Sequence, residues 1–464
     1  MRPKPHVLTL PYRTDSVAWF ACLAGRRQPV WLDSGRPHST YGRFDIMAAE
    51  PETILSSQDG KTRLLDAQGQ SHSLTGHPFD LIEQWLPQPL EPVPDLPFVS
   101  GAIGYFSYDL VRQLESLPAH ARHDIALPDF WLGLYPWAIV QDHHRKQTFL
   151  VARPDMDPMP LHRELSQQDP DFELKQFLEP KKSFKIRKFK EELTADSYQK
   201  KLSQIQAYIR AGDCYQVNLA QRFQADCQGD PLAAYLALRQ ALPSPFSGYL
   251  PRPEGAILSL SPERFIALRN GVAETRPIKG TAPRHPDPIR DQAEADALRR
   301  SAKNRAENLM IVDLLRNDLS KCCDEVRVPA LFELQSFANV HHLVSTVTGH
   351  LKSGATAVDL LRGSFPGGSI TGAPKIRAME IIEELEPVRR SVYCGSLGYL
   401  SADGQMDTSI AIRTLVCHQN RLYCWGGGGI VADSEPDAEY QESLNKVRVL
   451  METLEREFGD RPPL

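Results

Sequence analysis

The sequence predicts an α+β protein in which large, mainly antiparallel β-sheets are covered on the outside by helices. Strand-like and helix-like segments follow one another irregularly, without the regular alternation that a doubly wound sheet or an α/β barrel requires. The pair Asn270-Gly271 between two strand-like runs is typical of a two-residue hairpin, which joins antiparallel strands. A chain of 464 residues is also long enough to bury a large core.

Composition and charge place the chain among globular proteins and restrict its partners. It is 41% hydrophobic and 24% charged, with a formal net charge of −5. Its 53 Lys and Arg residues form no basic stripe, which argues against nucleic acid as a partner. The N-terminal residues contain no apolar run typical of a signal peptide, and no apolar run reaches the ~18 residues of a membrane span. We therefore expect a cytoplasmic protein that does not contact a membrane.

The cysteines provide no evidence for disulfides or for a built-in nucleophile. Eight cysteines are scattered from Cys22 to Cys424 without a Cys-x-x-Cys pair, and we expect all of them to be reduced thiols. Neither Gly-x-Cys-x-Gly nor Gly-x-Ser-x-Gly occurs, so a glutamine-hydrolysing cysteine is not evident. If the reaction uses nitrogen from glutamine, a partner protein has to release it.

The chain divides by composition into three parts. Residues 1–165 contain short strand-like runs broken by Pro, Gly and Asp. Residues 166–189 form a polar connection, and residues 190–464 form a second and larger region. In this region, the helical spacing of Tyr198, Leu202 and Ile205 predicts a helix that stops at Gly212. We further expect helices near 302–319 and 373–385, a strand over 409–416, and a C-terminal helix capped by Ser434.

The predicted hairpin brings Glu263 and Lys279 to one end of the pair of strands. Pairing across the Asn270-Gly271 turn places Glu263 opposite Ile278. Ideal register puts the side chains of Glu263 and Lys279 on opposite faces, so their contact requires either a bulge or a Lys279 that already lies past the strand, which Pro277 and Gly280 favour. A lysine beside a carboxyl group in a closed pocket can act as a nucleophile while the carboxyl protonates a leaving group. A solvated surface ion pair is the plainer alternative.

An acidic helix face follows a run of four glycines at 426–429. Glu439 and Glu442 lie three residues apart and share a face with Lys446. Two carboxylates on one turn can bind Mg²⁺, which keeps other positions for water and an anionic substrate. The glycines let backbone N–H groups approach an anion closely. The alternative is a solvated helix face.

Charged residues in two apolar patterns need partners. Glu307 lies on the side of its predicted helix that carries apolar residues, where a carboxylate requires an arginine or a metal ion. Arg413 interrupts an apolar strand and requires a bidentate anion. The pair His341-His342 is ambiguous, because histidines in apolar strands are more often packed than catalytic.

Several motifs in one order resemble the chorismate-utilising enzymes, the family of anthranilate synthase component I. They are Gly-Asp-Cys-Tyr-Gln-Val-Asn (212–218), Ser-Pro-Glu-Arg-Phe (261–265), Pro-Ile-Lys-Gly-Thr (277–281), Glu-Asn-Leu-Met-Ile-Val-Asp-Leu (307–314), Gly-Ala-Pro-Lys (372–375) and Gly-Gly-Ile-Val (428–431). The resemblance covers nearly the whole chain. It implies two large sheets packed together, with helices outside and the catalytic site between the sheets.

The resemblance also implies roles for individual residues. Glu307 and Glu442 match the Mg²⁺ ligands of the family, with Glu439 close by through water. The implied substrate-binding residues are Arg413, Tyr399, Gly428, Gly429, Ser369, Lys446 and Thr281. His342 matches a histidine near the reacting ring, and Glu263 matches the general acid that helps the C4 hydroxyl of chorismate to leave.

Lys279 distinguishes two branches of this family. Members that form anthranilate resemble Pro-Ile-Ala-Gly-Thr at 277–281, whereas members that aminate C4 resemble Pro-Ile-Lys-Gly-Thr, as here. The implied reaction is attack of Lys279 on C2, loss of the C4 hydroxyl, and addition of ammonia from a partner glutamine amidotransferase. The product would be 4-amino-4-deoxychorismate, the precursor of 4-aminobenzoate and folate. An anthranilate-forming enzyme and a non-catalytic protein that binds chorismate or tryptophan are the alternatives.

The N-terminal segment 31–45 resembles the tryptophan-binding pocket of the family. Its candidate residues are Asp33, Ser34, Arg43 and Phe44. The resemblance leaves open whether tryptophan binds there, as a regulator or as a structural component.

Overall fold

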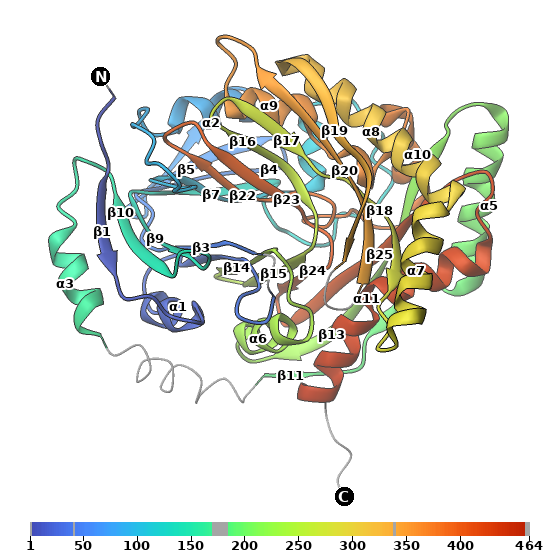
Figure 1. Ribbon diagram of the computed structural model, residues 1–464, viewed down its shortest axis with the longest axis horizontal. Coiled ribbons are helices and arrows are strands. Elements are labelled where there is room, and N and C mark those ends of the chain that lie inside the picture. Colours follow the sequence, from blue (N-terminus) through green and yellow to red (C-terminus); the bar gives the residue numbers. More distant parts are fainter. Residues whose placement is uncertain (1, 40–41, 169–183, 337–339, 460–464) are drawn as a thin grey trace, which may run out of the picture.

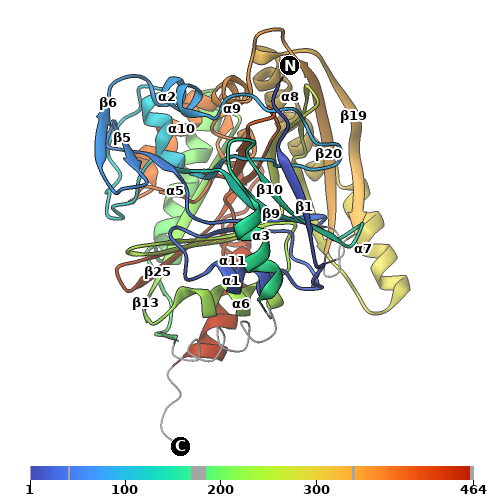
Figure 2. The same ribbon diagram turned by 90° about the vertical axis from the view of Figure 1, so that its left-hand side faces the viewer.

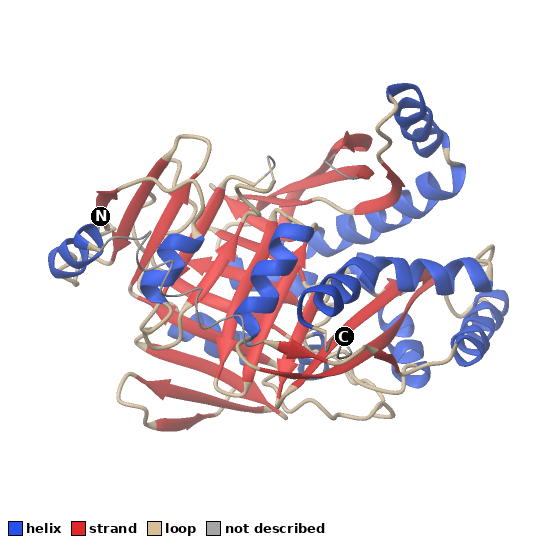
Figure 3. Ribbon diagram, turned by 90° about the horizontal axis from the view of Figure 1, so that it is seen from below, coloured by secondary structure: helices blue, strands red, loops and turns tan. Residues whose placement is uncertain are grey.

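Two large β-sheets pack face to face, and helices cover their outer sides (Figures 1 and 3). The computed structural model describes residues 2–39, 42–168, 184–336 and 340–459, so residues 169–183 of the expected polar connection lie outside the described part. Neighbouring strands pair antiparallel within both sheets. The predicted α+β fold with mainly antiparallel sheets is therefore confirmed.

The first sheet has thirteen strands among the described residues. Its order is β1 (His6–Leu10), β10 (Gln147–Ala152), β9 (Trp137–Asp142), β3 (Phe44–Ala48), β2 (Val30–Asp33), β14 (Phe246–Arg252), β15 (Gly255–Ser261), β24 (Thr414–His418), β25 (Arg421–Ile430), β13 (Gln216–Gln228) and β11 (Lys185–Ile186). Two short strands, β12 (Lys190–Glu191) and β21 (Gly372–Ala373), also pair with β13.

The second sheet has twelve strands in the described part of the chain. Its order is β18 (Ile278–Pro283), β20 (Val340–Leu351), β17 (Val272–Thr275), β16 (Arg264–Arg269), β23 (Met406–Ile410), β22 (Ser396–Ser401), β7 (Gly101–Phe106), β8 (Phe130–Tyr135), β4 (Thr53–Gln58), β5 (Lys61–Asp66) and β6 (Ser71–Leu74), with β19 (Cys323–Ser336) on β20. Figure 2 shows β5 and β6 on one side of the molecule and β19 and β20 on the other.

The helices are distributed around these sheets. They are α1 (Val17–Leu23), α2 (Pro78–Trp85), η1 (Tyr108–Gln113), α3 (Met159–Gln167), α5 (Ala195–Ala211), α6 (Pro231–Ala241), α7 (Pro288–Arg300), α8 (Ala302–Cys322), α9 (Ala357–Ser364), η3 (Gly368–Ile370), α10 (Lys375–Leu385) and α11 (Pro436–Phe458). Helix α5 ends at Gly212, which has the left-handed φ of 84°, as its sequence predicts. No helix in the described ranges is long and apolar enough to cross a membrane.

Two main clusters of buried apolar side chains hold the layers together. One lies between the sheets and includes Ile103 of β7 and Ile257 of β15. The other joins the outer face of the first sheet to helices, with Trp19 of α1, Leu238 of α6 and Leu450 of α11. Burying a side chain of this size stabilises a fold by about 1.5–3 kcal/mol. Strands from residues 1–165 and from residues 190–464 pair within both sheets, so these clusters combine residues of both regions.

Candidate active site

The chain crosses from one sheet to the other at two neighbouring connections. Glu263 lies between β15 and β16, and Arg413 lies between β23 and β24. The two connections are hydrogen-bonded to the adjoining strands, since Ile410 N–H donates to Glu263 O (3.0 Å) and Leu260 N–H donates to Arg413 O (3.1 Å). The prediction of one strand over 409–416 was wrong. Strand β23 ends at Ile410 and β24 begins at Thr414, and between them Arg413 has a φ of 49°, which is outside the range of extended strands.

Glu263 is a buried carboxyl group with a single side-chain hydrogen-bond donor in the described structure. Ser369 Oγ donates to Glu263 Oε1 at 2.8 Å. Burial raises the pKa of Glu263 to about 7, although Ser369, Lys279 and Lys446 act in the opposite direction. A carboxyl group of this kind keeps a proton near neutral pH and can give it to a leaving group.

Lys279 enters the same site from β18. The pairing of β18 with β20 shifts between Ile278 and Thr281, and Gly280 has a φ of 88°. Lys279 thus lies past the hairpin strand β17, which ends at Thr275, whereas the expected pairing of Ile278 with Glu263 was wrong, because Ile278 pairs with Val344. Burial lowers the pKa of Lys279, against the opposing effect of the Glu307 carboxylate. The shift favours the neutral amine that a nucleophile needs.

The glycines of β25 make room for these groups. A Cβ atom at Gly429 would lie 2.5 Å from Gln216 Nε2 and 3.0 Å from Lys279 Nζ. A Cβ atom at Gly428 would lie 3.2 Å from Glu439 Oε2. The glycine run therefore brings bare backbone of the first sheet against the side chains that α11 and β18 contribute.

The predicted metal-binding carboxylates form ion pairs with lysine ammonium groups. Lys303 Nζ lies 3.6 Å from Glu439 Oε1 and 4.0 Å from Glu307 Oε1. Lys446 Nζ lies 2.8 Å from Glu442 Oε1. Within the described ranges, no three acidic, histidine or cysteine side chains converge in a geometry that could hold a metal ion. The donor set of carboxylates is nevertheless one that Mg²⁺ accepts, since it takes one or two protein carboxylates and completes its shell with water and substrate.

The start of α11 differs from its prediction. The N-cap residue is Glu435, so the prediction of Ser434 as the cap was wrong. Ser434 Oγ instead accepts a hydrogen bond from Val431 N–H at 3.1 Å and donates to Glu439 Oε1 at 2.7 Å. Ser434 therefore links the glycine-rich strand to the first carboxylate of the helix.

Arg413 is a partly buried guanidinium that forms no ion pair with a carboxylate in the described structure. Burial lowers its pKa, and no charged neighbour compensates. Burial and the nearby Arg413 lower the pKa of His342 to about 4, so this imidazole is neutral. His342 Nδ1 lies 2.9 Å from Thr281 Oγ1. An anion entering the site would meet an uncompensated positive charge at Arg413.

Sequence reasoning missed Gln216. Both polar atoms of its side-chain amide are buried without a hydrogen-bond partner in the described structure. It precedes the apolar Val217 on β13, and its amide lies beside the same glycine, Gly429, as Lys279 Nζ. The signal was available, because a Gln between the apolar positions of a buried strand requires a polar partner.

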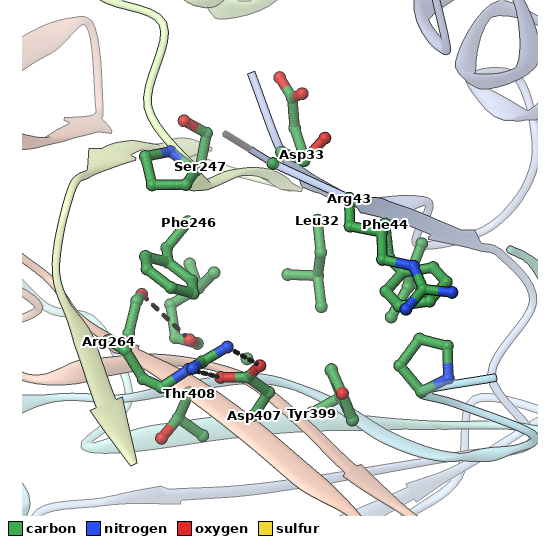
Figure 4. A pocket seen from close by; sticks show the side chains of 18 of the residues that line it. Leu32, Asp33, Arg43, Phe44, Phe246, Ser247, Arg264, Tyr399, Asp407 and Thr408 are labelled. Carbon is green, nitrogen blue, oxygen red and sulfur yellow. Dashed lines mark hydrogen bonds and ion pairs between the residues drawn. The ribbon is translucent and has the colours of Figure 1, made fainter. Parts of the chain in front are cut away.

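A cavity of about 210 Å³ lies away from these groups, between β2, β14, β16 and β22 (Figure 4). The tryptophan-pocket candidates Asp33, Ser34, Arg43 and Phe44 all line it. Tyr399 also lines this cavity. Tyr399 shares the lining with Asp407 and Arg264, whereas Glu263 and Lys279 are not among the residues that line this cavity.

The chain belongs to the chorismate-binding enzymes. The family described as chorismate binding enzyme matches residues 27–452. Aminodeoxychorismate synthase component 1 of Salmonella typhimurium is 48% identical over 458 residues, which cover 97% of this chain and 98% of that protein. The Escherichia coli protein of the same name is 47% identical, with 97% and 99% covered.

A solved structure shares the fold at lower identity. Anthranilate synthase component I from Streptococcus pneumoniae TIGR4 aligns with a TM-score of 0.75 and 33% identity, covering 89% of this chain and 93% of that one. The fold with two packed sheets and the family expected from the motifs are both confirmed.

Proposed function

We propose that this protein aminates chorismate at C4 to give 4-amino-4-deoxychorismate, which is used for 4-aminobenzoate and folate. The observation that carries the proposal is Lys279, a largely buried amine with a lowered pKa, in a site shared with Glu263, a carboxyl whose pKa burial raises to about 7. The Salmonella typhimurium and Escherichia coli relatives, which are 48% and 47% identical to this chain, are named after this activity. An anthranilate-forming enzyme has no need of a nucleophilic lysine at this position.

The proposed reaction has two steps. The neutral amine of Lys279 forms a bond to C2 of chorismate, the ring double bonds shift, and the C4 hydroxyl leaves as water with the proton of Glu263. Ammonia then forms a bond to C4 as the double bonds shift back, and the bond between C2 and Lys279 breaks. The lysine thereby separates loss of the hydroxyl from addition of ammonia, and each step has a lower barrier.

The remaining groups are proposed to bind the substrate. Arg413 offers two donors to a carboxylate of chorismate, and the backbone of Gly428 and Gly429 lets the ring approach Lys279. Glu307 and Glu442 are the proposed Mg²⁺ ligands, with Glu439 through water. Mg²⁺ held by these carboxylates would supply positive charge to a carboxylate of the substrate. Lys446, Thr281 and His342 would complete the polar lining.

The nitrogen donor is proposed to be ammonia from a glutamine amidotransferase subunit. The relatives are named component 1, which implies at least one further component. A mixture of this protein with chorismate, ammonium and Mg²⁺ should therefore form product without glutamine, and glutamine should replace ammonium only when the partner is added.

The product distinguishes the proposed activity from its alternatives. Addition of aminodeoxychorismate lyase to the reaction should yield 4-aminobenzoate. Without ammonia, mass spectrometry of the intact protein should detect an adduct with the mass of chorismate less one water, located on Lys279. Anthranilate formed without the lyase would contradict the proposal, and absence of any product would favour a non-catalytic chorismate-binding protein.

For the cavity between β2, β14, β16 and β22, we propose tryptophan as the ligand. Phe44, Phe246 and Tyr399 provide aromatic walls for an indole ring (Figure 4). Asp33 and Arg43 add charges of both signs to the lining, and they are paired with Arg239 at 2.6 Å and with Asp142 at 2.7 Å. Residues 1–165 would thus form one wall of this cavity, while residues 190–464 contain the proposed catalytic groups. Calorimetric titration with tryptophan tests this proposal, with Phe44→Ala as the variant expected to lose binding.

A further inference from the structure

The loop between α9 and α10 delivers the hydrogen-bond donor to Glu263. Ser369 lies in the short helix η3 within this loop, and its hydroxyl donates to Glu263 Oε1 at 2.8 Å. Both side chains are buried, so water does not replace this donor easily. The position of the loop therefore controls a contact made directly to the proposed general acid.

A buried ion pair fastens the start of this loop. Lys375, the first residue of α10, donates from Nζ to Asp318 Oδ2 at 2.5 Å. The same ammonium donates to Pro366 O at 2.9 Å and to Ser364 O at 3.2 Å. Asp318 lies on α8, the helix that also carries Glu307. One ammonium group thus connects the loop to the helix of a proposed metal ligand.

Two glycines let the backbone of the loop pack closely against its neighbours. A Cβ atom at Gly368 would lie 2.6 Å from Leu314 Cδ2 of α8, and one at Gly367 would lie 2.6 Å from Ile410 Cδ1 of β23. Closely packed interiors transmit displacements rather than absorb them. A movement at Pro366 would therefore reach Ser369, three residues further along the chain.

We propose that Lys375, paired with Asp318, is a positioning residue that holds Ser369 in hydrogen-bond contact with Glu263. The inference rests on the proposed function, in which Glu263 gives its proton to the departing hydroxyl. In the part of the chain that the structure describes, neither Lys375 nor Asp318 forms a hydrogen bond or an ion pair with Glu263 or Lys279. The pair acts through the peptide carbonyls of the loop.

The experiment compares Lys375→Met, Ser369→Ala and the double variant. The quantity measured is kcat/KM for chorismate as a function of pH, with the concentration of free NH₃ held constant. Because the Ser369 hydrogen bond lowers the pKa of Glu263, its loss should move the high-pH decline of kcat/KM to higher pH. Each single variant should show this shift, and the double variant should shift no further. We expect Lys375→Met to lower kcat/KM about 100-fold, the loss that a misplacement of about 1 Å can cause.

Control variants distinguish loss of the Ser369 position from general destabilisation of the protein. Lys321 also contacts Asp318, at 3.1 Å, but it holds Gly363 O rather than the two carbonyls nearer Ser369. Lys321→Met should therefore keep the wild-type pH profile, and Lys375→Arg should restore most of it. If Lys375→Met does not fold, the pair Lys375→Met with Asp318→Asn removes both buried charges and takes its place.

A folded variant without the Lys375 ammonium and with an unshifted pH profile would overturn the inference, as would additive shifts in the double variant. The product of the wild-type enzyme is identified first, so failure of the proposed function is recognised separately. Hydrogen exchange of residues 363–374 gives a readout that needs no turnover. The amides of this loop should exchange faster in Lys375→Met than in Lys321→Met, and equal rates would also count against the inference.

Discussion

Lys279 Nζ lies 3.8 Å from Oε2 of Glu307, so the proposed nucleophile forms an ion pair with a proposed metal ligand. Both side chains are largely buried, with 16% and 14% of their surfaces exposed. The carboxylate of Glu307 stabilises the ammonium form of Lys279, and burial of the amine acts against it. Glu307 therefore influences the nucleophile as well as the proposed metal.

The metal-free Glu307→Gln variant should contain a more reactive Lys279. Glu307 is the strongest of the charges that raise the pKa of Lys279, so its removal lowers that pKa further. Trinitrophenylation of Lys279, followed over pH by peptide mass spectrometry, should reach half its maximal rate at lower pH than in the wild type. Glu442→Gln should produce a smaller shift in the same direction. An unchanged profile in Glu307→Gln would contradict this account.

Glu263→Gln should stabilise the protein at alkaline pH while abolishing turnover. The folded state raises the pKa of Glu263 from 4.5 to about 7, so the carboxyl favours folding fully below pH 4.5, and this contribution is lost as pH rises through 7. The difference in free energy of unfolding between Glu263→Gln and wild type should therefore grow with pH over this window, by about 3 kcal/mol. Urea unfolding at pH 5 and pH 8 measures it.

A control for that experiment is Glu325→Gln, because the Glu325 side chain is 60% exposed. Its stability relative to wild type should not depend on pH. Parallel behaviour of Glu263→Gln and Glu325→Gln would show that the carboxyl of Glu263 is not protonated near neutral pH.

Arg413→Met should weaken chorismate binding without weakening the fold. Removal of a buried charge that lacks a carboxylate partner does not destabilise the protein. Loss of a charge-assisted pair with substrate should cost about 1.5–3 kcal/mol of binding, or roughly 10- to 100-fold in affinity. Thermal unfolding with and without chorismate tests both statements. Equal stabilisation of variant and wild type by chorismate would exclude Arg413 as a substrate ligand.

Gly429→Ala should abolish activity, because the added methyl group would collide with Gln216 and displace Lys279. The matched control is Gly25→Ala, where no atom lies within 4 Å of the added Cβ. Circular dichroism should show folded protein for both variants, and only Gly429→Ala should lose product formation. Full activity of Gly429→Ala would place the reaction elsewhere.

Local signals in the sequence predicted the local structure well. The Asn270-Gly271 turn gives the hairpin with Arg269 opposite Val272, as this type of turn requires. Gly212 ends α5 for the reason expected of a left-handed residue. The motif order led to the family, and the family match over residues 27–452 confirms it.

Contacts between distant segments could not be predicted in the same way. The turn at Asn270-Gly271 determines pairing only as far as Glu274, and β18 then pairs with β20, about which the hairpin contains no information. An apolar run such as 409–416 does not distinguish one strand from two strands in different sheets. The contact of Ser369 with Glu263 joins residues 106 positions apart, and no local pattern encodes it.

The pairing of strands that are distant in the sequence also limits how early each sheet can fold during synthesis on the ribosome. Strand β7 (Gly101–Phe106) pairs with β22 (Ser396–Ser401), and β2 (Val30–Asp33) pairs with β14 (Phe246–Arg252), so the early strands are synthesised long before their partners. Until then their hydrogen-bonding edges stay open, and open edges of this kind promote aggregation. The nascent chain should therefore depend on chaperones, and neither sheet can close before most of the polypeptide has left the exit tunnel.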